Sequence, residues 1–203
     1  MILSASLLCV SKFSAFYNSV FRLTSSQAQD LLSSKPSSCS ILSVCKLEPG
    51  DILIRRYITS QTRLADFVFH PYFTHSAMYL GNDQIVEAVG TEKDSRDDIQ
   101  ISSFSKSDWL DPGIERWVIV RPRNIRSKFE TIKRNLEHIA NDPDYIFGLP
   151  REGYKRTTCA DLIFEQLYPE NVKRPVTPDY LFSRIVDDSD NFEIIGYSIT
   201  DKN

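Results

Sequence analysis

The sequence predicts an α+β domain built on an antiparallel sheet, and three observations lead to this class. Short apolar runs of strand length come first, and helical patterns are interspersed among them without the regular strand–helix alternation of a parallel sheet. Two of the runs flank a Gly-Asn-Asp turn, which is typical of an antiparallel hairpin. Hydrophobic residues make up 41% of the 203 residues and charged residues 25%, which is ordinary for a domain with a packed core.

Five apolar runs are predicted to be strands, and they cover residues 52–54, 75–80, 85–89, 117–120 and 192–197. The first run follows Pro49-Gly50, which is a turn signal. Residues 81–84 join the second and third runs and predict a tight hairpin turn. The last run is expected to close the sheet.

Three helices are predicted in the same part of the chain. Residues 127–140 carry an apolar stripe of helical period, and Ser127 followed by Glu130 predicts a capping box at its start. A second helix is expected to start near Thr158, and a third to run from Pro178 to about residue 186.

The first 46 residues have a different composition, rich in serine and poor in acidic residues. Residues 25–32 predict a short helix that ends before Pro36. We interpret residues 1–46 as an N-terminal extension, partly ordered at best or serving as a targeting segment, and residues 47–203 as the folded domain. The apolar start at 2–10 has no basic residues before it and no small-x-small cleavage site after it. A cytoplasmic location is therefore favoured, with export or secretion as an effector as the alternative.

Charge and motif content narrow the possible partners. The net charge is −3 and Lys and Arg are scattered, so no nucleic-acid partner is expected. No run approaches the ~18 apolar residues of a membrane-spanning helix, so no integral membrane segment is expected. The chain also has no Cys/His spacing typical of a metal site and no Gly-rich phosphate loop, so we expect no metal and no cofactor.

The four cysteines, Cys9, Cys39, Cys45 and Cys159, include no C-x-x-C pair. A disulfide between Cys39 and Cys45 would close only a short loop. Free thiols in a reducing compartment are therefore favoured over that disulfide.

Cys159 is the candidate nucleophile. It follows Thr158, and Thr158 with Asp161 forms a capping-box pattern that puts Cys159 in the first helical position. Unpaired amides and the positive end of the helix dipole stabilise a thiolate there, although Asp161 adds an opposing charge. A buried structural cysteine is the other interpretation, and the local context supports both equally.

His75 is the candidate general base, because it opens a predicted strand and thiolate chemistry needs an imidazole within hydrogen-bond reach. A satisfied core or surface histidine is the alternative. His70 precedes Pro71 in a loop, and His138 lies between the apolar positions of a helix and is expected to face solvent.

Glu87 is the third candidate, since a carboxylate inside an apolar run needs a partner and could orient an imidazole. A two-residue turn, however, would place Glu87 opposite Met78 and on the other face from His75. A bulge or a strong twist could bring the two together. The alternative is a sheet-edge carboxylate that faces solvent.

The hairpin of residues 74–88 resembles the histidine hairpin of NlpC-type papain-like cysteine hydrolases. In that family a histidine opens a strand that ends Tyr-Leu-Gly, and a polar orienting residue follows twelve positions later, as His75 and Glu87 do here. Cys159 follows the histidine, which is similar to the circularly permuted branch of YiiX/YaeF-like proteins, a poxviral group and lecithin retinol acyltransferase relatives. Residues 47–53, 144–148 and 176–181 also resemble that branch.

The resemblance implies a circularly permuted papain-like fold, with the nucleophile helix packed against an antiparallel sheet. It implies a thiol hydrolase of the cysteine peptidase or amidase kind, in which Cys159, His75 and Glu87 cleave a peptide or isopeptide-type amide through a thioester. Ala160 departs from the Ser or Glu that relatives often carry there. Small-molecule, peptide and acyl-lipid substrates all suit the family.

Two alternatives stay open. One is a lipid acyl hydrolase or acyltransferase on the same site, whose apolar trough would be lined by Phe67, Phe69, Tyr72 and Phe73. The other is a catalytically inactive binding module that keeps the fold and has a Cys159 thiol of ordinary reactivity.

Overall fold

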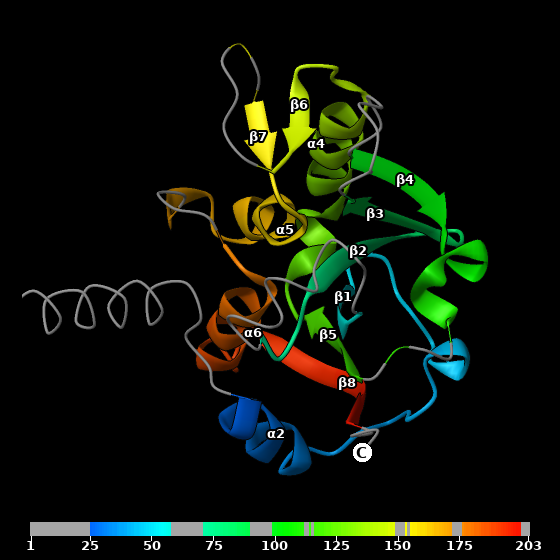
Figure 1. Cartoon of the computed structure of the whole chain (residues 1–203), viewed down its shortest axis with the longest axis vertical. Helices are drawn as coiled ribbons and strands as arrows, with labels where there is room; N and C mark the ends of the chain where they lie inside the picture. Colours follow the sequence, from blue (N-terminus) through cyan, green and yellow to red (C-terminus); the bar gives the residue numbers. More distant parts are fainter. Residues whose placement is uncertain are drawn as a thin grey trace, which may run out of the picture.

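The computed structural model describes residues 25–57, 71–89, 99–111, 114, 116–148, 153, 155–171 and 176–199. Its centre is a six-stranded sheet in the order β4-β3-β2-β1-β5-β8, in which every neighbouring pair is antiparallel (Figure 1). Helices and an antiparallel sheet together confirm the α+β class.

The five predicted strands all form. They are β1 (Ile52–Arg56), β2 (His75–Gly81), β3 (Gln84–Ala88), β5 (Arg116–Pro122) and β8 (Phe192–Ile199). Sequence reasoning missed β4 (Ile99–Ser103), which has one buried residue and four half-buried ones and therefore no clear alternation of apolar and polar side chains. A separate parallel pair joins β6 (Tyr145–Phe147) to β7 (Lys155–Thr157).

Four α-helices are described, namely α2 (Ser25–Ser33), α4 (Phe129–Asn141), α5 (Cys159–Leu167) and α6 (Pro178–Asp187). The capping box predicted at Ser127 is wrong. Ser127 ends a 3₁₀ turn, η4 (Ile125–Ser127), and its hydroxyl donates to the Asn124 carbonyl at 3.3 Å. Helix α4 therefore starts one residue later than predicted, with Lys128 as its N-cap and no side-chain cap.

Period-2 alternation along the strands divides the core into two clusters on opposite faces of the sheet. On one face, residues such as Ile54, Met78 and Val118 pack against α2, α4, α5 and α6. On the other face, Leu53 and Ala77 pack beneath irregular segments that contain the short turns η1 (Leu42–Val44), η2 (Phe104–Lys106) and η3 (Asp108–Leu110). The helix-side cluster is the larger.

Residues 25–46 are packed onto this sheet. Ala28 and Leu32 of α2 are buried in the helix-side cluster, and Leu42 of η1 is buried in the other one. Between them, Cys39 forms a parallel bridge with Gly196 of β8. The described part of the N-terminal extension is therefore built into the core of the domain.

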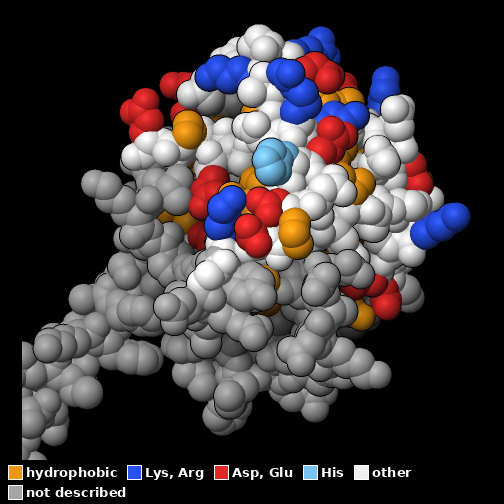
Figure 2. Space-filling view, turned by 90° about the horizontal axis from the view of Figure 1, so that it is seen from above, with side chains coloured by type: hydrophobic (Ala, Val, Ile, Leu, Met, Phe, Trp, Pro, Cys, Tyr) orange, Lys and Arg blue, Asp and Glu red, His pale blue; other side chains and the backbone are white. Residues whose placement is uncertain are grey.

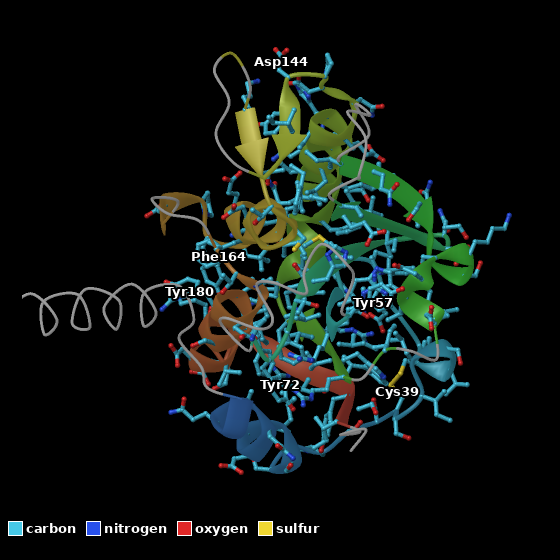
Figure 3. All side chains as sticks on the ribbon, in the orientation of Figure 1. Cys39, Tyr57, Tyr72, Asp144, Phe164 and Tyr180 are labelled. Carbon is cyan, nitrogen blue, oxygen red and sulfur yellow. A yellow bond between two sulfur atoms is a disulfide. The ribbon has the colours of Figure 1, made fainter. Side chains whose placement is uncertain are left out.

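Cys39 and Cys45 form a disulfide, so the expectation that both are free thiols is wrong (Figure 3). The 3₁₀ turn η1 folds the short segment back on itself and brings the two Cα atoms to 5.5 Å, within the usual range for a disulfide. Cys9 lies outside the described residues, and among the described cysteines Cys159 is the free one.

Surface charges are mixed in sign. On the face shown in Figure 2, acidic and basic side chains lie among one another and form no extended basic patch. Across the described ranges, no helix has the length and apolarity needed to cross a membrane.

Candidate active site

Helix α5 begins as the sequence predicts. The Thr158 hydroxyl accepts a hydrogen bond from the Asp161 amide at 3.1 Å, and Cys159 is the first helical residue. The Asp161 carboxylate accepts from the Thr158 hydroxyl at 2.9 Å and from the Val176 amide at 2.7 Å. These hydrogen bonds hold Asp161 in place and fix the start of helix α5. Cys159 therefore lies at the N-terminal end of the helix, where main-chain amides have no partner within the helix.

Cys159 is buried, with 6% of its surface exposed, because α5 packs mainly against β2. The Cys159 sulfur and the His75 ring interact, and each shifts the pKa of the other. His75 is the first residue of β2, so its ring can reach the helix N-terminus on one side of the sheet and the irregular segments on the other. The structure thus brings together two residues that are far apart in the sequence.

The hairpin between β2 and β3 places Glu87 beside His75. Its turn has two residues, Asn82 and Asp83, with φ of 51° and 64°, as expected for the tight turn of a hairpin. Gly81 pairs with Gln84, but Tyr79 pairs with Ile85 and Met78 with Val86, so Leu80 is an extra residue on β2.

This bulge corrects the simple turn geometry, which placed Glu87 opposite Met78. With one extra residue on β2, Met78 pairs with Val86, and Glu87 falls on the same face of the sheet as His75. Oε2 of Glu87 lies 2.7 Å from Nε2 of His75. The sequence showed that a bulge could bring Glu87 to His75. The pattern of apolar and polar residues near Leu80 did not show its position.

The Glu87 carboxylate is 2% exposed and is held from several directions. Nε1–H of Trp109 donates to the same Oε2 at 2.9 Å. The other oxygen, Oε1, accepts longer hydrogen bonds from Gln100 at 3.4 Å and Ser102 at 3.5 Å, both on β4. The alternative that Glu87 faces solvent at a sheet edge is therefore wrong, since β4 covers it.

Arg55 is a buried cation near the Glu87 carboxylate. Arg55 is 3% exposed, forms an ion pair with Asp108 at 2.8 Å and stacks over the Trp109 ring at 4.2 Å. The Trp109 ring centre lies 5.6 Å from that of His75. Arg55 of β1 and Trp109 of η3 thus form one side of the site, next to the Glu87 carboxylate.

The electrostatics favour a charged pair at Cys159 and His75. Burial by itself lowers the pKa of His75, but the negative charge of Cys159, its hydrogen bond and the Glu87 carboxylate raise that pKa to about 9. Burial likewise raises the pKa of Cys159, and the charge and hydrogen bond of His75 outweigh it, so the thiol pKa is lowered. Both directions stabilise a thiolate next to an imidazolium.

The pKa of Glu87 is shifted by burial and by its neighbours in the same way. Burial raises the pKa of Glu87, while the hydrogen bond and charge of His75, the Trp109 hydrogen bond and the charge of Arg55 lower it, and the net direction is down. The carboxylate therefore stays ionised and keeps the imidazolium charged.

Ser76 is a further residue at the sulfur that sequence reasoning missed. Its side chain is fully buried, and its main-chain N–H and its hydroxyl both lower the pKa of Cys159. Its hydroxyl oxygen has no hydrogen-bond partner among the described residues. A serine among the apolar residues of β2 is the sequence signal that could have pointed to it.

Asp179 fixes the chain just before His75. Its two carboxylate oxygens accept from the amides of Tyr72 at 2.8 Å and Phe73 at 2.7 Å, and it is 2% exposed. Burial raises its pKa to about 7, although the two amide bonds and the charges of Arg56 and Arg116 act the other way. An acidic residue in the first turn of α6 was visible in the sequence, but its distant partners were not.

The remaining candidates fall outside the site or outside the described residues. His138 is exposed on α4, as predicted. Tyr72 and Phe73 are each 1% exposed in the helix-side cluster, where Phe73 packs edge-on against Phe182, so these two rings belong to the core. His70, Phe67 and Phe69 lie outside the described residues. Within the described part, no cluster of three or more His, Cys, Asp or Glu is arranged to hold a metal.

Comparison with known proteins gives no match, either to a protein-family model or to a curated protein sequence.

Proposed function

We propose that this chain is a thiol hydrolase that cleaves an amide bond, with Cys159 as nucleophile, His75 as general acid–base and Glu87 as the orienting carboxylate. One observation supports this most directly: the His75 ring interacts with Cys159, so that each shifts the pKa of the other, and Nε2 of the same ring lies 2.7 Å from Oε2 of Glu87. The three groups come from α5, β2 and β3, so no local folding requirement explains their meeting. They fit the three roles of nucleophile, base and orienting group.

The chemistry follows from the positions of these groups. The Cys159 thiolate attacks the carbonyl carbon, and the oxyanion that forms can accept a hydrogen bond from the Cys159 main-chain N–H at the start of α5. The His75 imidazolium gives its proton to the leaving amine, and a thioester remains. Neutral His75 then takes a proton from water, the resulting hydroxide attacks the thioester, and the carboxylic acid product and the thiol are released.

We further propose that the domain has the circularly permuted papain-like fold. The nucleophile helix packed against an antiparallel sheet, and the order histidine, carboxylate, cysteine along the chain, support this proposal. The same site would also suit transfer or hydrolysis of a lipid acyl group, since both proceed through a thioester at a thiolate. Matched amide and ester substrates separate these two activities.

The first test measures the alkylation rate of Cys159 by iodoacetamide against pH, with the modified peptide quantified by mass spectrometry. A free thiol reacts with a pKa near ~8.5, while a thiolate–imidazolium pair stays reactive well below that pH. We expect fast alkylation at pH 6 in the wild type and its loss in His75→Ala. His138→Ala, which removes an exposed histidine, serves as the matched control.

An inactive binding module gives a different result. In that case the wild type and His75→Ala would alkylate at equal rates with an ordinary thiol pKa, and the proposal would be abandoned. If the pair is present, peptide amides and acyl esters are compared by single-turnover acylation of Cys159. Cys159→Ser provides the blank.

A further inference from the structure

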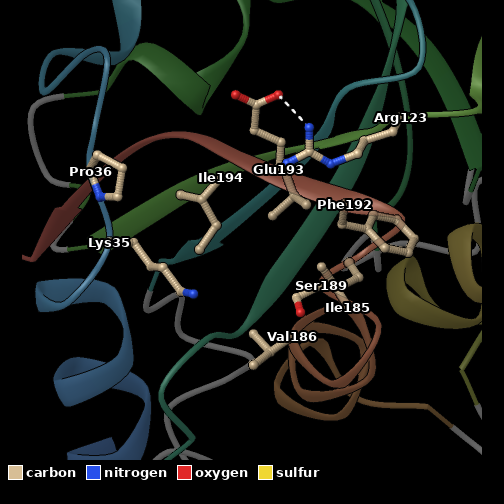
Figure 4. Close-up of a pocket in the computed structure, with 10 residues that line it drawn as sticks. Lys35, Pro36, Arg123, Ile185, Val186, Ser189, Phe192, Glu193 and Ile194 are labelled. Carbon is tan, nitrogen blue, oxygen red and sulfur yellow. Dashed lines mark ion pairs between the residues drawn. The ribbon is translucent and has the colours of Figure 1, made fainter.

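A cavity of about 320 Å³ lies between the end of α2, strand β8 and the C-terminal half of α6 (Figure 4). It is lined by Lys35, Pro36, Val120, Arg123, Ile185, Val186, Ser189, Phe192, Glu193 and Ile194. None of these residues belongs to the Cys159 site. The cavity therefore needs an explanation of its own.

The position of the cavity follows from how the edge of β8 is covered. The Ser38 amide donates to the Ile195 carbonyl at 2.9 Å, and the Tyr197 amide donates to the Ser37 hydroxyl at 3.3 Å. Pro36 comes next and has no N–H, so it cannot continue this pairing along β8. The edge is left open next to Ile194, and the cavity is there.

The walls of the cavity are mainly apolar. Val120 of β5 is fully buried, and Ile185 of α6 and Phe192 of β8 are 2% and 8% exposed. Val186 and Ile194 are half-buried and complete the surface. A hydrocarbon chain placed along these residues would be removed from water mainly against apolar surface.

The charges at the rim are unequal. Arg123 forms an ion pair with Glu193 at 3.6 Å, so this pair contributes little net charge (Figure 4). Lys35 forms no ion pair with a described residue, and in Figure 4 its ammonium group points into the cavity. One positive charge is therefore left facing an apolar cavity.

We propose that this cavity binds a medium-chain monocarboxylate of about eight carbons, with its carboxylate at Lys35 and its chain along Ile185 and Phe192. Ligand cavities begin at roughly 300 Å³, and at roughly 30 Å³ for each water-sized group this one holds about ten non-hydrogen atoms, the size of octanoate. The ammonium selects the anion over a neutral or cationic analogue. This binding function is separate from the hydrolase proposal.

Isothermal titration calorimetry with octanoate, octan-1-ol and octylammonium tests the proposal, using the Cys159→Ser protein so that no turnover at the thiol contributes. We expect a Kd for octanoate on the order of 0.1–1 mM, because a ligand of this size has few atoms to bury. Octanol should bind about threefold to fivefold more weakly, in line with the small stabilisation from one exposed charge pair, and octylammonium more weakly still.

Two variants assign the ligand to this cavity. Lys35→Gln should bind octanoate and octanol with equal affinity, whereas Lys128→Gln, an exposed lysine on another part of the surface, should keep the preference. Ser189→Trp, which changes an exposed lining residue and fills the cavity, should abolish binding of both. The proposal is overturned if octanoate gives no heat of binding, if octanol binds equally well to the parent protein, or if Ser189→Trp leaves the affinity unchanged.

Discussion

Nε2 of His75 lies 2.7 Å from Oε2 of Glu87, and the two meet only because Leu80 is an extra residue in the intervening hairpin. The bulge shifts the pairing of β2 with β3 by one residue, so that the Glu87 carboxylate lies on the same face of the sheet as His75. A buried carboxylate that accepts from both His75 and Trp109 then sets the orientation of the ring and stabilises its positive charge.

Replacing Glu87 by Gln keeps the shape of the side chain and removes its charge. We expect the pKa of His75 to fall and kcat/KM to fall by about 10²-fold, since the imidazolium loses its anionic partner. NMR titration of the His75 ring, with the exposed His138 as internal reference, measures the pKa directly. An unchanged His75 titration would remove Glu87 from the site.

The proposed hydrolase activity should depend on pH through the two opposing pKa shifts. The thiol pKa is lowered and that of His75 is raised to about 9, so the charged pair exists between these two values. Activity should rise as pH passes upward through the thiol pKa and fall again near pH 9, where His75 loses the proton that the leaving amine needs. A pH profile of kcat/KM with an alkaline limb that does not fall near 9 would contradict this assignment.

Ser76→Ala removes a buried hydroxyl that faces the Cys159 sulfur. We expect the thiol pKa to rise, so that iodoacetamide alkylation moves to higher pH. The free energy of unfolding should change little, because the hydroxyl has no hydrogen-bond partner among the described residues. Ser102→Ala, which removes a 3.5 Å contact to Glu87, is the control and should leave the alkylation profile in place. Equal profiles for Ser76→Ala and the wild type would show that the hydroxyl does not stabilise the thiolate.

Trp109→Phe removes the N–H that donates to Glu87 while keeping an aromatic ring in the core. The buried carboxylate would lose a hydrogen bond, which costs about 1–3 kcal/mol in the free energy of unfolding. The pKa of Glu87 should also rise, because this bond helps to lower it. Trp117→Phe, in the same cluster but without a contact to Glu87, should cost less in urea denaturation. The reverse order would count against the positioning role of Trp109.

Asp179 gives the folded protein a pH dependence that is independent of catalysis. Its pKa is raised to about 7 in the folded state, so the folded state binds this proton more tightly than the unfolded chain, whose Asp titrates near ~3.9. The stability from this group is fully present below about pH 4 and is lost as the pH rises through 7. Relative to Asp179→Asn, the wild type should lose up to about 1.4 kcal/mol per pH unit over this range. If the free energy of unfolding changes with pH in the same way in the two proteins, the raised pKa of Asp179 is contradicted.

The sequence predicted the elements of the site better than their contacts. The Thr158 cap and the first helical position of Cys159 follow from local hydrogen bonding, and a local pattern was enough to find them. The joining of His75 to Glu87 depends on a bulge that leaves no trace in the apolar pattern. Trp109 reaches the site from a 3₁₀ turn, where no periodic signal exists.

The disulfide shows a different limit of sequence reasoning. The short loop between Cys39 and Cys45 led us to expect two free thiols. The sequence did not reveal the turn that brings their Cα atoms to 5.5 Å. Reduction, or Cys39→Ser with Cys45→Ser, should cost about 2 kcal/mol in the free energy of unfolding according to the loop-entropy estimate for so short a loop. Urea denaturation with and without reductant measures this cost.

The segment at residues 37–39 also affects how the molecule behaves toward its own copies. Strand β8 is at one end of the sheet, and the hydrogen bonds from Ser38 to Ile195 and from Tyr197 to Ser37 occupy main-chain groups that would otherwise face outward. An uncovered edge of this kind is a template for pairing with the strand of another molecule. Residues 37–39 therefore protect this part of the β8 edge from pairing edge to edge with the sheet of another molecule.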